Sequence, residues 1–230
     1  GNIMKIVALL PMKANSERVK GKNFKSFYGK PLFKWILNKL LQVDQIDKVI
    51  INTDAREIIN SYNVFDNEKI IIRDRPKHLC GDFMSMNKVI QNDVENIEAD
   101  AYLMTHTTNP LVSINSIIGI IDKYMDDINN GYDSTFSVNK IQTRFYDHKC
   151  QPINHDPSKL LRTQDLDPWY EENSNLYVFS KESFLKTHAR IGVNPSYFVT
   201  NKIESTDIDS EADWEIAEAL MSHIQRKSVK

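Results

Sequence analysis

The sequence is poor in the features that mark several large classes of protein. Its 230 residues contain two cysteines, Cys80 and Cys150, so we expect a reducing, cytoplasmic setting and no disulfide framework. No apolar run approaches the roughly 18–20 residues that span a bilayer, and no signal peptide is visible. The formal net charge is only −2, so no global field attracts nucleic acid or an anionic membrane. Any anion site must therefore be a local cluster of basic residues.

Glycine is also scarce, and the seven glycines form no phosphate-binding fingerprint. Gly21 and Gly29 are isolated, and neither the G-x-G-x-x-G nor the Walker A spacing occurs. The length predicts one domain, which we expect to span residues 4–230. Residues 1–3 resemble a remnant of cloning before a native start at Met4.

Hydrophobic periodicity predicts strands that alternate with helices over most of the chain. Short apolar runs indicate buried strands at residues 6–10, 48–53, 69–73, 101–105, 134–138, 176–179 and 197–200. Apolar residues at helical spacing predict helices at residues 31–43, 55–62, 86–97, 113–125, 181–188 and 210–225. This order is typical of parallel βαβ units, so we predict an α/β fold with a doubly wound, mostly parallel sheet.

The pattern lapses over residues 139–173, a polar and aromatic segment with three prolines. A structureless loop of that length would be unusual inside a compact domain. We expect either a projecting segment or a surface that packs on a second subunit.

The segment from Ile6 to Asn23 holds the first candidate site. An apolar run ends at Pro11, and a polar loop with several cations follows before the next helix. A buried strand that leads into a basic loop and then a helix is a common way to hold a phosphate-bearing ligand. Side chains for a triphosphate would come from Lys13, Ser16, Arg18 and Lys22. The alternative is an ordinary solvated loop.

A second candidate is the acidic pair Asp207 and Asp209. In an extended backbone, residues two apart point the same way, and paired carboxylates with phosphate oxygens are a usual Mg²⁺ site. The alternative is an acidic start to the last helix, where Ser210 and Asp213 resemble a capping box.

Three further groups of polar residues stand at strand ends or in loops. His106, Thr108 and Asn109 follow a strand, where they would line a ligand crevice or simply form a turn. A second group mixes arginine, amide and aromatic residues: Arg162, Gln164, Tyr170 and Asn173. Such a group would suit a carboxylated sugar or a subunit interface. Arg75, followed by Asp82 and Ser85, would reach a phosphate or base, or pair with Asp74 or Asp82.

Taken in order, these segments resemble the acylneuraminate cytidylyltransferase family, which makes CMP-sialic acids and related CMP-nonulosonates. The first loop resembles A-R-x-x-S-K-G-x-x-x-K-N, with Lys13 at the Arg position and Lys22-Asn23 as the closing pair. Further matches follow to G-K-P-L (residues 29–32), S-T-D (53–54), R-P-x-x-L-A-x-D (75–82), Q-P-T-S-P-L (106–111), R-x-Q…N-G-A-I-Y (162–177) and D-I-D-T-E-x-D (207–213). The similarity covers nearly the whole chain.

The resemblance implies a Rossmann-like nucleotidyltransferase that transfers CMP from CTP to an acidic sugar and releases pyrophosphate. It implies catalytic roles for Lys13, Lys22 and Asp209, and Mg²⁺ on Asp207 and Asp209. The implied nucleotide-binding residues are Lys13, Asn15, Ser16, Arg18, Lys22, Asn23, Arg75, Asp82 and Ser85. The implied acceptor-binding residues are His106, Thr108, Asn109, Arg162, Gln164, Tyr170 and Asn173. A homodimer is also implied, in which residues 139–173 cap the active site of the partner.

The sequence departs from the family pattern mainly on the acceptor side. His106 replaces a glutamine, Val112 replaces an arginine, and Ser174-Asn175 replaces Gly-Ala. Within the first loop, Lys13 is a point charge in place of a forked guanidinium and Glu17 stands where lysine is usual. Two alternatives therefore stay open: a nucleotidyltransferase with another acceptor, such as a phosphorylated sugar, and a nucleotide-binding homologue with impaired catalysis.

Overall fold

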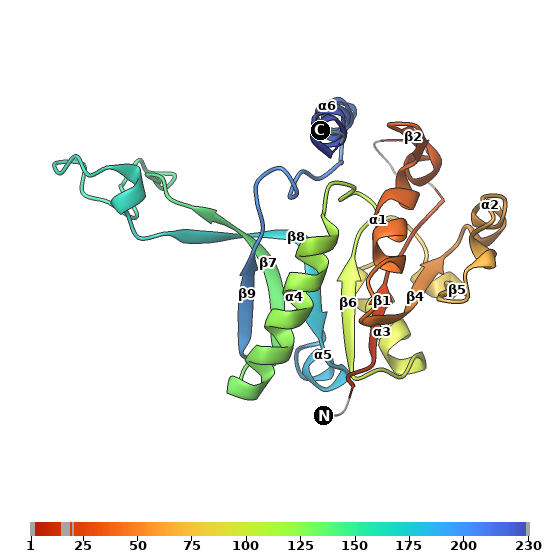
Figure 1. Cartoon of the computed structure of the whole chain (residues 1–230). Coiled ribbons are helices and arrows are strands. Elements are labelled where there is room, and N and C mark those ends of the chain that lie inside the picture. The colour runs from red at the N-terminus through yellow and green to blue at the C-terminus, as the bar shows by residue number, and fades with distance from the viewer. Residues whose placement is uncertain (1–2, 15–18, 20, 229–230) are drawn as a thin grey trace.

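A computed structural model describes residues 3–14, 19 and 21–228 of the chain, without the side chain of Phe65. Within this part of the chain, one sheet has seven strands in the order β5-β4-β1-β6-β8-β7-β9 (Figure 1). The strands are β1 (Ile6–Leu9), β4 (Ile46–Thr53), β5 (Ile70–Asp74), β6 (Ala101–Thr105), β7 (Ser134–Ile141), β8 (Trp169–Phe179) and β9 (Pro195–Val199). Only β8 among them is antiparallel to its neighbours, so the fold is the expected doubly wound, mostly parallel α/β sheet.

The central strands are apolar on both faces because helices cover both faces. In β1, Ile6 and Ala8 pack with α1 (Leu32–Leu41) and α4 (Ile114–Asp127) on one side. Val7 and Leu9 pack with α3 (Met86–Asn96) and α5 (Lys181–Thr187) on the other side. Strand β1 is therefore buried throughout, and its ends cannot shift without disturbing two layers of side chains.

The chain leaves β1 toward one side of the sheet and returns to the other side of β1 at β6. Strand β4 pairs with β1 on one flank, and β6 pairs with β1 on the opposite flank, both in parallel. Where the connections from two neighbouring strands run in opposite directions, the loops after those strands separate at the carboxyl edge of the sheet and leave a crevice there. In Figure 1, α6 (Glu211–Ser228) lies above this edge.

Strands β7 and β8 extend beyond the sheet as an arm (Figure 1). The expected strands at residues 134–138 and 176–179 are too short, because the pairing continues from Val138–Glu172 to Ile141–Trp169. Residues 139–141 and 169–173 are thus strand, and only residues 142–168 form the irregular tip, which includes the short helix η5 (Thr163–Asp165). The prediction missed them because exposed polar residues on a free hairpin carry no apolar alternation.

The remaining elements are short. A two-stranded hairpin of β2 (Ser26–Phe27) and β3 (Lys30–Pro31) precedes α1, and α2 (Arg56–Asn60) follows β4. Further short 3-10 helices are η1 (Lys22–Phe24), η2 (Val64–Asp66), η3 (Lys77–Leu79) and η4 (Ile128–Asn130). Across the described residues, no helix is both long and apolar enough to cross a membrane.

Glu204 fastens the loop between β9 and α6 to the start of α4. Its buried carboxylate accepts hydrogen bonds from the Ser113 backbone N–H at 2.6 Å, from Ser116 Oγ at 3.0 Å and from Asn201 Nδ2 at 2.7 Å. A carboxylate at a helix N-terminus also interacts favourably with the positive end of the helix dipole. Because residues 207–209 follow in the same loop, this anchor helps to fix where the acidic pair lies.

Replacing Glu204 with alanine should therefore destabilise the fold. Three donors would lose their acceptor at a buried position, and we expect the free energy of unfolding to fall by about 2 kcal/mol. Denaturant titration would measure the change, with Glu215→Ala on the exposed side of α6 as the control. A loss as small as that of the control would contradict the anchoring role.

Candidate active site

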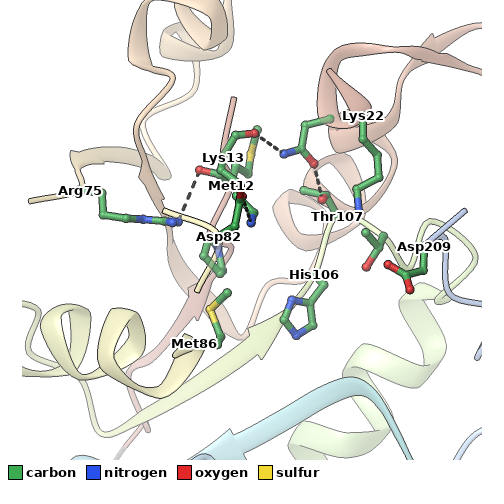
Figure 2. A pocket seen from close by; sticks show the side chains of 12 residues that line it. Met12, Lys13, Lys22, Arg75, Asp82, Met86, His106, Thr107 and Asp209 are labelled. Atoms are coloured by element: carbon green, nitrogen blue, oxygen red, sulfur yellow. Dashed lines mark hydrogen bonds and ion pairs between the residues drawn. The ribbon is translucent and has the colours of Figure 1, made fainter. Parts of the chain in front are cut away.

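A pocket of about 360 Å³ opens at the carboxyl edge of β1 and β6, where the crevice is expected. Figure 2 shows Arg75 and Lys22 entering it from opposite sides, with His106 between Met86 and Asp209 in this view. Its walls are formed by residues from several loops: Pro11, Met12, Lys13, Lys22, Asn23, Arg75, Asp82, Met86, His106, Thr107, Thr108 and Asp209.

The amide of Asn23 joins the two segments that leave the centre of the sheet. Its Nδ2 donates to the backbone carbonyl of Lys13 at 2.7 Å, and its Oδ1 accepts from Thr107 Oγ1 at 2.5 Å (Figure 2). The side chain is buried, and Gly21, at φ +62°, supplies the left-handed turn before η1. Asn23 is thus a structural link as well as a wall of the pocket. The sequence analysis missed Thr107, whose role depends on this contact.

Arg75 is held by backbone and amide groups rather than by an acid. Its Nε donates to Asn52 Oδ1 at 2.9 Å, and its Nη2 donates to the Asn52 carbonyl at 3.1 Å and to the Met12 carbonyl at 3.5 Å. The expected pairing of Arg75 with Asp74 or Asp82 is therefore wrong. Those carboxylates are taken by other cations: Asp74 by Arg56 at 2.7 Å and Asp82 by Lys13 at 3.3 Å.

A buried carboxylate behind Arg75 sets its orientation through Asn52. Asp93, which is 1% exposed, accepts from Asn52 Nδ2 at 2.9 Å and pairs with Arg73. Burial raises the pKa of Asp93, while these hydrogen bonds and the two arginines act in the opposite direction. Since Asn52 donates to Asp93 and accepts from Arg75, its amide has one consistent orientation, and Arg75 is presented to the pocket without a bound carboxylate.

Two lysines face the pocket in different environments. The ion pair of Lys13 with Asp82 has side chains that are 40% and 45% exposed, so it is weak and an incoming anion can replace it. Burial lowers the pKa of Lys22, and the nearby Asp207 and Asp209 act against this shift. Lys22 is therefore a partly desolvated cation, whose interaction with a phosphate would be stronger than that of a surface lysine.

The acidic pair lies beside Lys22, at the start of α6. Ile208, fully buried between the two aspartates, donates its backbone N–H to the Thr108 carbonyl at 3.0 Å. Asp209 lines the pocket, while Asp207 Oδ1 accepts from Asn109 Nδ2 at 3.3 Å. Burial raises the pKa of Asp207, and a hydrogen bond from Thr108 and the charge of Lys22 oppose the rise.

The capping arrangement is also present next to this pair. Asp213 accepts from the backbone N–H groups of Asp209 and Ser210, and Ser210 Oγ accepts from the Asp213 N–H at 3.2 Å. Because Asp213 caps the helix, that role does not require Asp207 and Asp209. Within the described part of the chain, no three acidic, histidine or cysteine side chains are arranged to hold a metal. The two carboxylates alone fit Mg²⁺ only when phosphate oxygens complete its shell.

His106 forms the floor of the pocket and is neutral. Burial lowers its pKa to about 3, and the charges of Arg190 and Lys22 add to the effect. Arg190 Nη1 lies 3.1 Å from Nε2 of the imidazole. The sequence analysis did not identify Arg190, because it lies 84 residues from His106 in a loop without a motif.

The residues assigned to acceptor binding are only partly brought together within one chain. Thr108 and His106 line the pocket and Asn109 lies behind it, but Arg162 and Gln164 are in the tip of the arm, where Arg162 pairs with Asp165 at 2.9 Å. On β8, Tyr170 stacks on Tyr197, and Asn173 bonds to Ser137, Asn139 and Thr200. Ser85 stands at the N-cap of α3 and does not line the pocket, and Asn15, Ser16 and Arg18 fall outside the described residues.

Cationic side chains at the switch point of a doubly wound sheet, with carboxylates in the same pocket, are typical of a nucleotide-binding enzyme of the Rossmann-like class. The comparisons with known proteins are more specific: the family model described as cytidylyltransferase matches residues 7–224, and the chain belongs to that family. It is 26% identical to the pseudaminic acid cytidylyltransferase of Campylobacter jejuni over 228 residues, which cover 94% of this chain and 96% of that protein. Identity to the CMP-N,N'-diacetyllegionaminic acid synthase of Legionella pneumophila is 25% over 236 residues, which cover 95% and 97% of the two chains.

Among solved structures, a CMP:2-keto-3-deoxy-manno-octonic acid synthetase in complex with CTP superposes with a TM-score of 0.69. The match covers 95% of this chain and 99% of that chain at 16% identity, so it supports the fold.

The lowered pKa of His106 predicts a pH dependence of stability. Between pH 6.5 and 3 the unfolded chain binds a proton at this histidine that the folded protein does not, so the free energy of unfolding falls as the pH falls through that window. From pH 7 to pH 5, we expect wild type to lose about 1–2 kcal/mol more than His106→Gln does. Urea titrations at both pH values would measure the difference. His223→Gln, at an exposed position of α6, should behave as wild type, whereas identical pH dependence of wild type and His106→Gln would contradict the assignment.

Proposed function

We propose that this cytidylyltransferase transfers CMP from CTP to the anomeric hydroxyl of an acidic nonulosonate-type sugar. The observation that carries the proposal is the pocket itself, in which Lys13, Lys22 and Arg75 surround a cavity at the carboxyl edge and Asp209 lies beside Lys22. In the reaction, the hydroxyl oxygen forms a bond to the α-phosphorus, the bond from that phosphorus to the β-phosphate oxygen breaks, and pyrophosphate leaves. The hydroxyl proton passes to solvent or to a general base, and no covalent intermediate with the protein is needed.

The donor half of the pocket has the charges that this transfer needs. Phosphoryl-type transfer depends on in-line positioning and on neutralising charge on the leaving group. Lys22 is partly desolvated. A phosphate can replace Asp82 as the partner of Lys13 at little cost in free energy, because that ion pair is exposed. Arg75, oriented by Asn52, supplies donors for a phosphate or for the base.

Asp207 and Asp209 would hold Mg²⁺ together with the phosphate oxygens. Their position beside Lys22 supports this role, as does the capping of α6 by Asp213 rather than by this pair. Bound there, Mg²⁺ would neutralise phosphate charge and favour ionisation of the attacking hydroxyl.

The acceptor half supports an acidic sugar but not one particular sugar. The relatives are named for pseudaminic, N-acylneuraminic and legionaminic acids, which are different acceptors. In this chain His106 and Thr108 line the acceptor side, next to the cationic wall. A carboxylate on the acceptor would be stabilised there, and a phosphorylated acceptor is the alternative that the same charges allow.

We also propose a homodimer in which the arm of one chain completes the pocket of the other. Arg162 and Gln164 lie on the arm, which leads away from the sheet of its own chain (Figure 1). The tip exposes apolar side chains, with Leu160 93%, Leu161 50% and Tyr146 49% exposed, and such residues are typical of a protein contact.

The free thiols of Cys80 and Cys150 support a reducing, cytoplasmic location.

Replacing Asp209 with asparagine should remove turnover and leave the fold intact. Loss of one metal-holding carboxylate should lower the rate of pyrophosphate release from CTP by about 100-fold or more. The assay would use Mg²⁺ and a panel of nonulosonates, with Asp126→Asn on the exposed surface of α4 as the control. An unchanged rate in Asp209→Asn would return the pair to a purely structural role. If CTP binds but no acidic sugar elicits Mg²⁺-dependent release, the proposed function is wrong.

A mixing experiment tests the arm. Asp209→Asn and Arg162→Ala chains should each be inactive alone, because each lacks one part of every site. Unfolded and refolded together, they should recover about a quarter of the wild-type activity, since half of the dimers are mixed and each has one intact site. Sedimentation would confirm the dimer. Failure to recover activity, with mixed dimers present, would show that Arg162 serves its own chain, whereas full activity of Arg162→Ala alone would show that it serves no site.

A further inference from the structure

Arg190 is a half-buried guanidinium behind the floor of the pocket, in the loop between α5 and β9. Its Nη1 lies 3.1 Å from His106 Nε2 and 3.5 Å from Met104 Sδ. None of the ion pairs in the described part of the chain includes Arg190, and it does not line the pocket itself. A charged group in such a position, without a carboxylate partner, needs an explanation.

Strand β8 holds the guanidinium in place. The Cζ atom of Arg190 lies 4.1 Å from the centre of the Tyr177 ring, over the ring face, and Tyr177 is 1% exposed. The Tyr177 hydroxyl in turn donates to Glu172 Oε2 at 2.5 Å and lies 3.2 Å from Ser174 Oγ. The arginine therefore has a fixed platform, and its contact with His106 is not the chance position of a surface side chain.

The chemistry of the contact determines the state of the imidazole. A guanidinium has only donors and stays protonated, so Nε2 of His106 must be the acceptor and must carry a lone pair. The single proton of the neutral ring is then on Nδ1. A proton on Nε2 would place two donors face to face, and a doubly protonated ring would also place two positive charges there.

Other charges around His106 do not reverse this conclusion. The cations of the pocket act in the same direction as Arg190, and the acidic side chains in it are those of Asp82, which pairs with Lys13, and Asp209, which lies beside Lys22. No hydrogen bond to Nδ1 comes from the part of the chain that the structure describes. His106 lines the pocket while Arg190 does not, and Nδ1 is not one of the buried side-chain nitrogens that lack a partner in the described residues, so this N–H is left for a ligand.

We propose that Arg190 is a positioning residue that locks His106 as a neutral Nδ1–H donor toward the acceptor substrate. The inference rests on the proposed function for the identity of that substrate. Such a donor fits an oxygen acceptor on the sugar, which can be a carbonyl, hydroxyl or carboxylate oxygen. It does not fit an ammonium group. It also removes His106 from the role of general base for the attacking hydroxyl, because its free lone pair is occupied by Arg190.

The state of the ring can be measured without any substrate. In protein labelled with ¹⁵N-histidine, the His106 signals, assigned by their loss in His106→Gln, should report the Nδ1–H tautomer and stay constant from pH 8 to pH 5. Arg190→Met should give a mixture of tautomers, whereas Arg190→Lys should restore much of the wild-type pattern. Arg226→Met, at an exposed position of α6, is the matched control. An Nε2–H tautomer in wild type, or no change in Arg190→Met, would overturn the proposal.

Kinetics would then connect the tautomer to acceptor recognition. With an acceptor that supports pyrophosphate release, Arg190→Met should raise the KM for the acceptor about tenfold, the effect of one lost hydrogen bond, with the KM for CTP nearly unchanged. Equal losses for both substrates, with the fold preserved, would mean that Arg190 has only a general structural role. If no acceptor supports turnover, the proposed function fails, while the ¹⁵N experiment still decides the state of His106.

Discussion

The site depends on the hydrogen bonds of one buried amide. Asn23 links the carbonyl of Lys13, after β1, to the hydroxyl of Thr107, after β6. These segments follow neighbouring parallel strands with buried side chains on both faces, so their starting points are rigid, and Asn23 adds a polar link between the loops beyond them. A buried donor or acceptor without its partner costs about 1–3 kcal/mol, and this penalty opposes any separation of the two loops. The Asn23 side chain therefore helps to fix the distance between the two loops that form the pocket.

Around that link, Arg75 and Lys22 enter the pocket from opposite sides, and the acidic pair lies on the side of Lys22. Arg75 is oriented through Asn52 by the buried Asp93, so its counter-charge lies at a distance and the guanidinium remains available to an anion. On the other side, Lys22 is next to Asp207 and Asp209, whose charges lessen the cost of its burial. A bound triphosphate would bring further negative charge to this side, and its repulsion from the two carboxylates is the physical reason for a divalent cation in the proposed reaction.

Much of the fold could be predicted from the sequence, because buried parallel strands and amphipathic helices leave local patterns. Strand β1 and helix α4 are examples in which apolar spacing alone indicates the element. The arm could be only partly predicted, since Lys140 pairs with Tyr170 and Glu171 pairs with Asn139 across a free hairpin, and no burial pattern records these pairs. For the site, Lys13 and His106, which follow strands, and Lys22 in the basic loop could be predicted from position. Thr107, Asn52 and Arg190 could not, because their roles come from contacts between segments distant in sequence.

The same distinction explains why the acceptor is harder to infer than the donor. Charge recognition of a triphosphate needs cations near a strand end, and both features are local in the sequence. Recognition of a sugar needs the direction and protonation of individual polar groups, which are decided by residues that never touch the ligand. His106 would be a base, a cation or a donor in three different surroundings, and Arg190 on Tyr177 selects the last of these. A change at Arg190 would therefore alter acceptor choice with every pocket-lining residue kept, so acceptor specificity in this chain depends on residues behind the pocket as well as on those that line it.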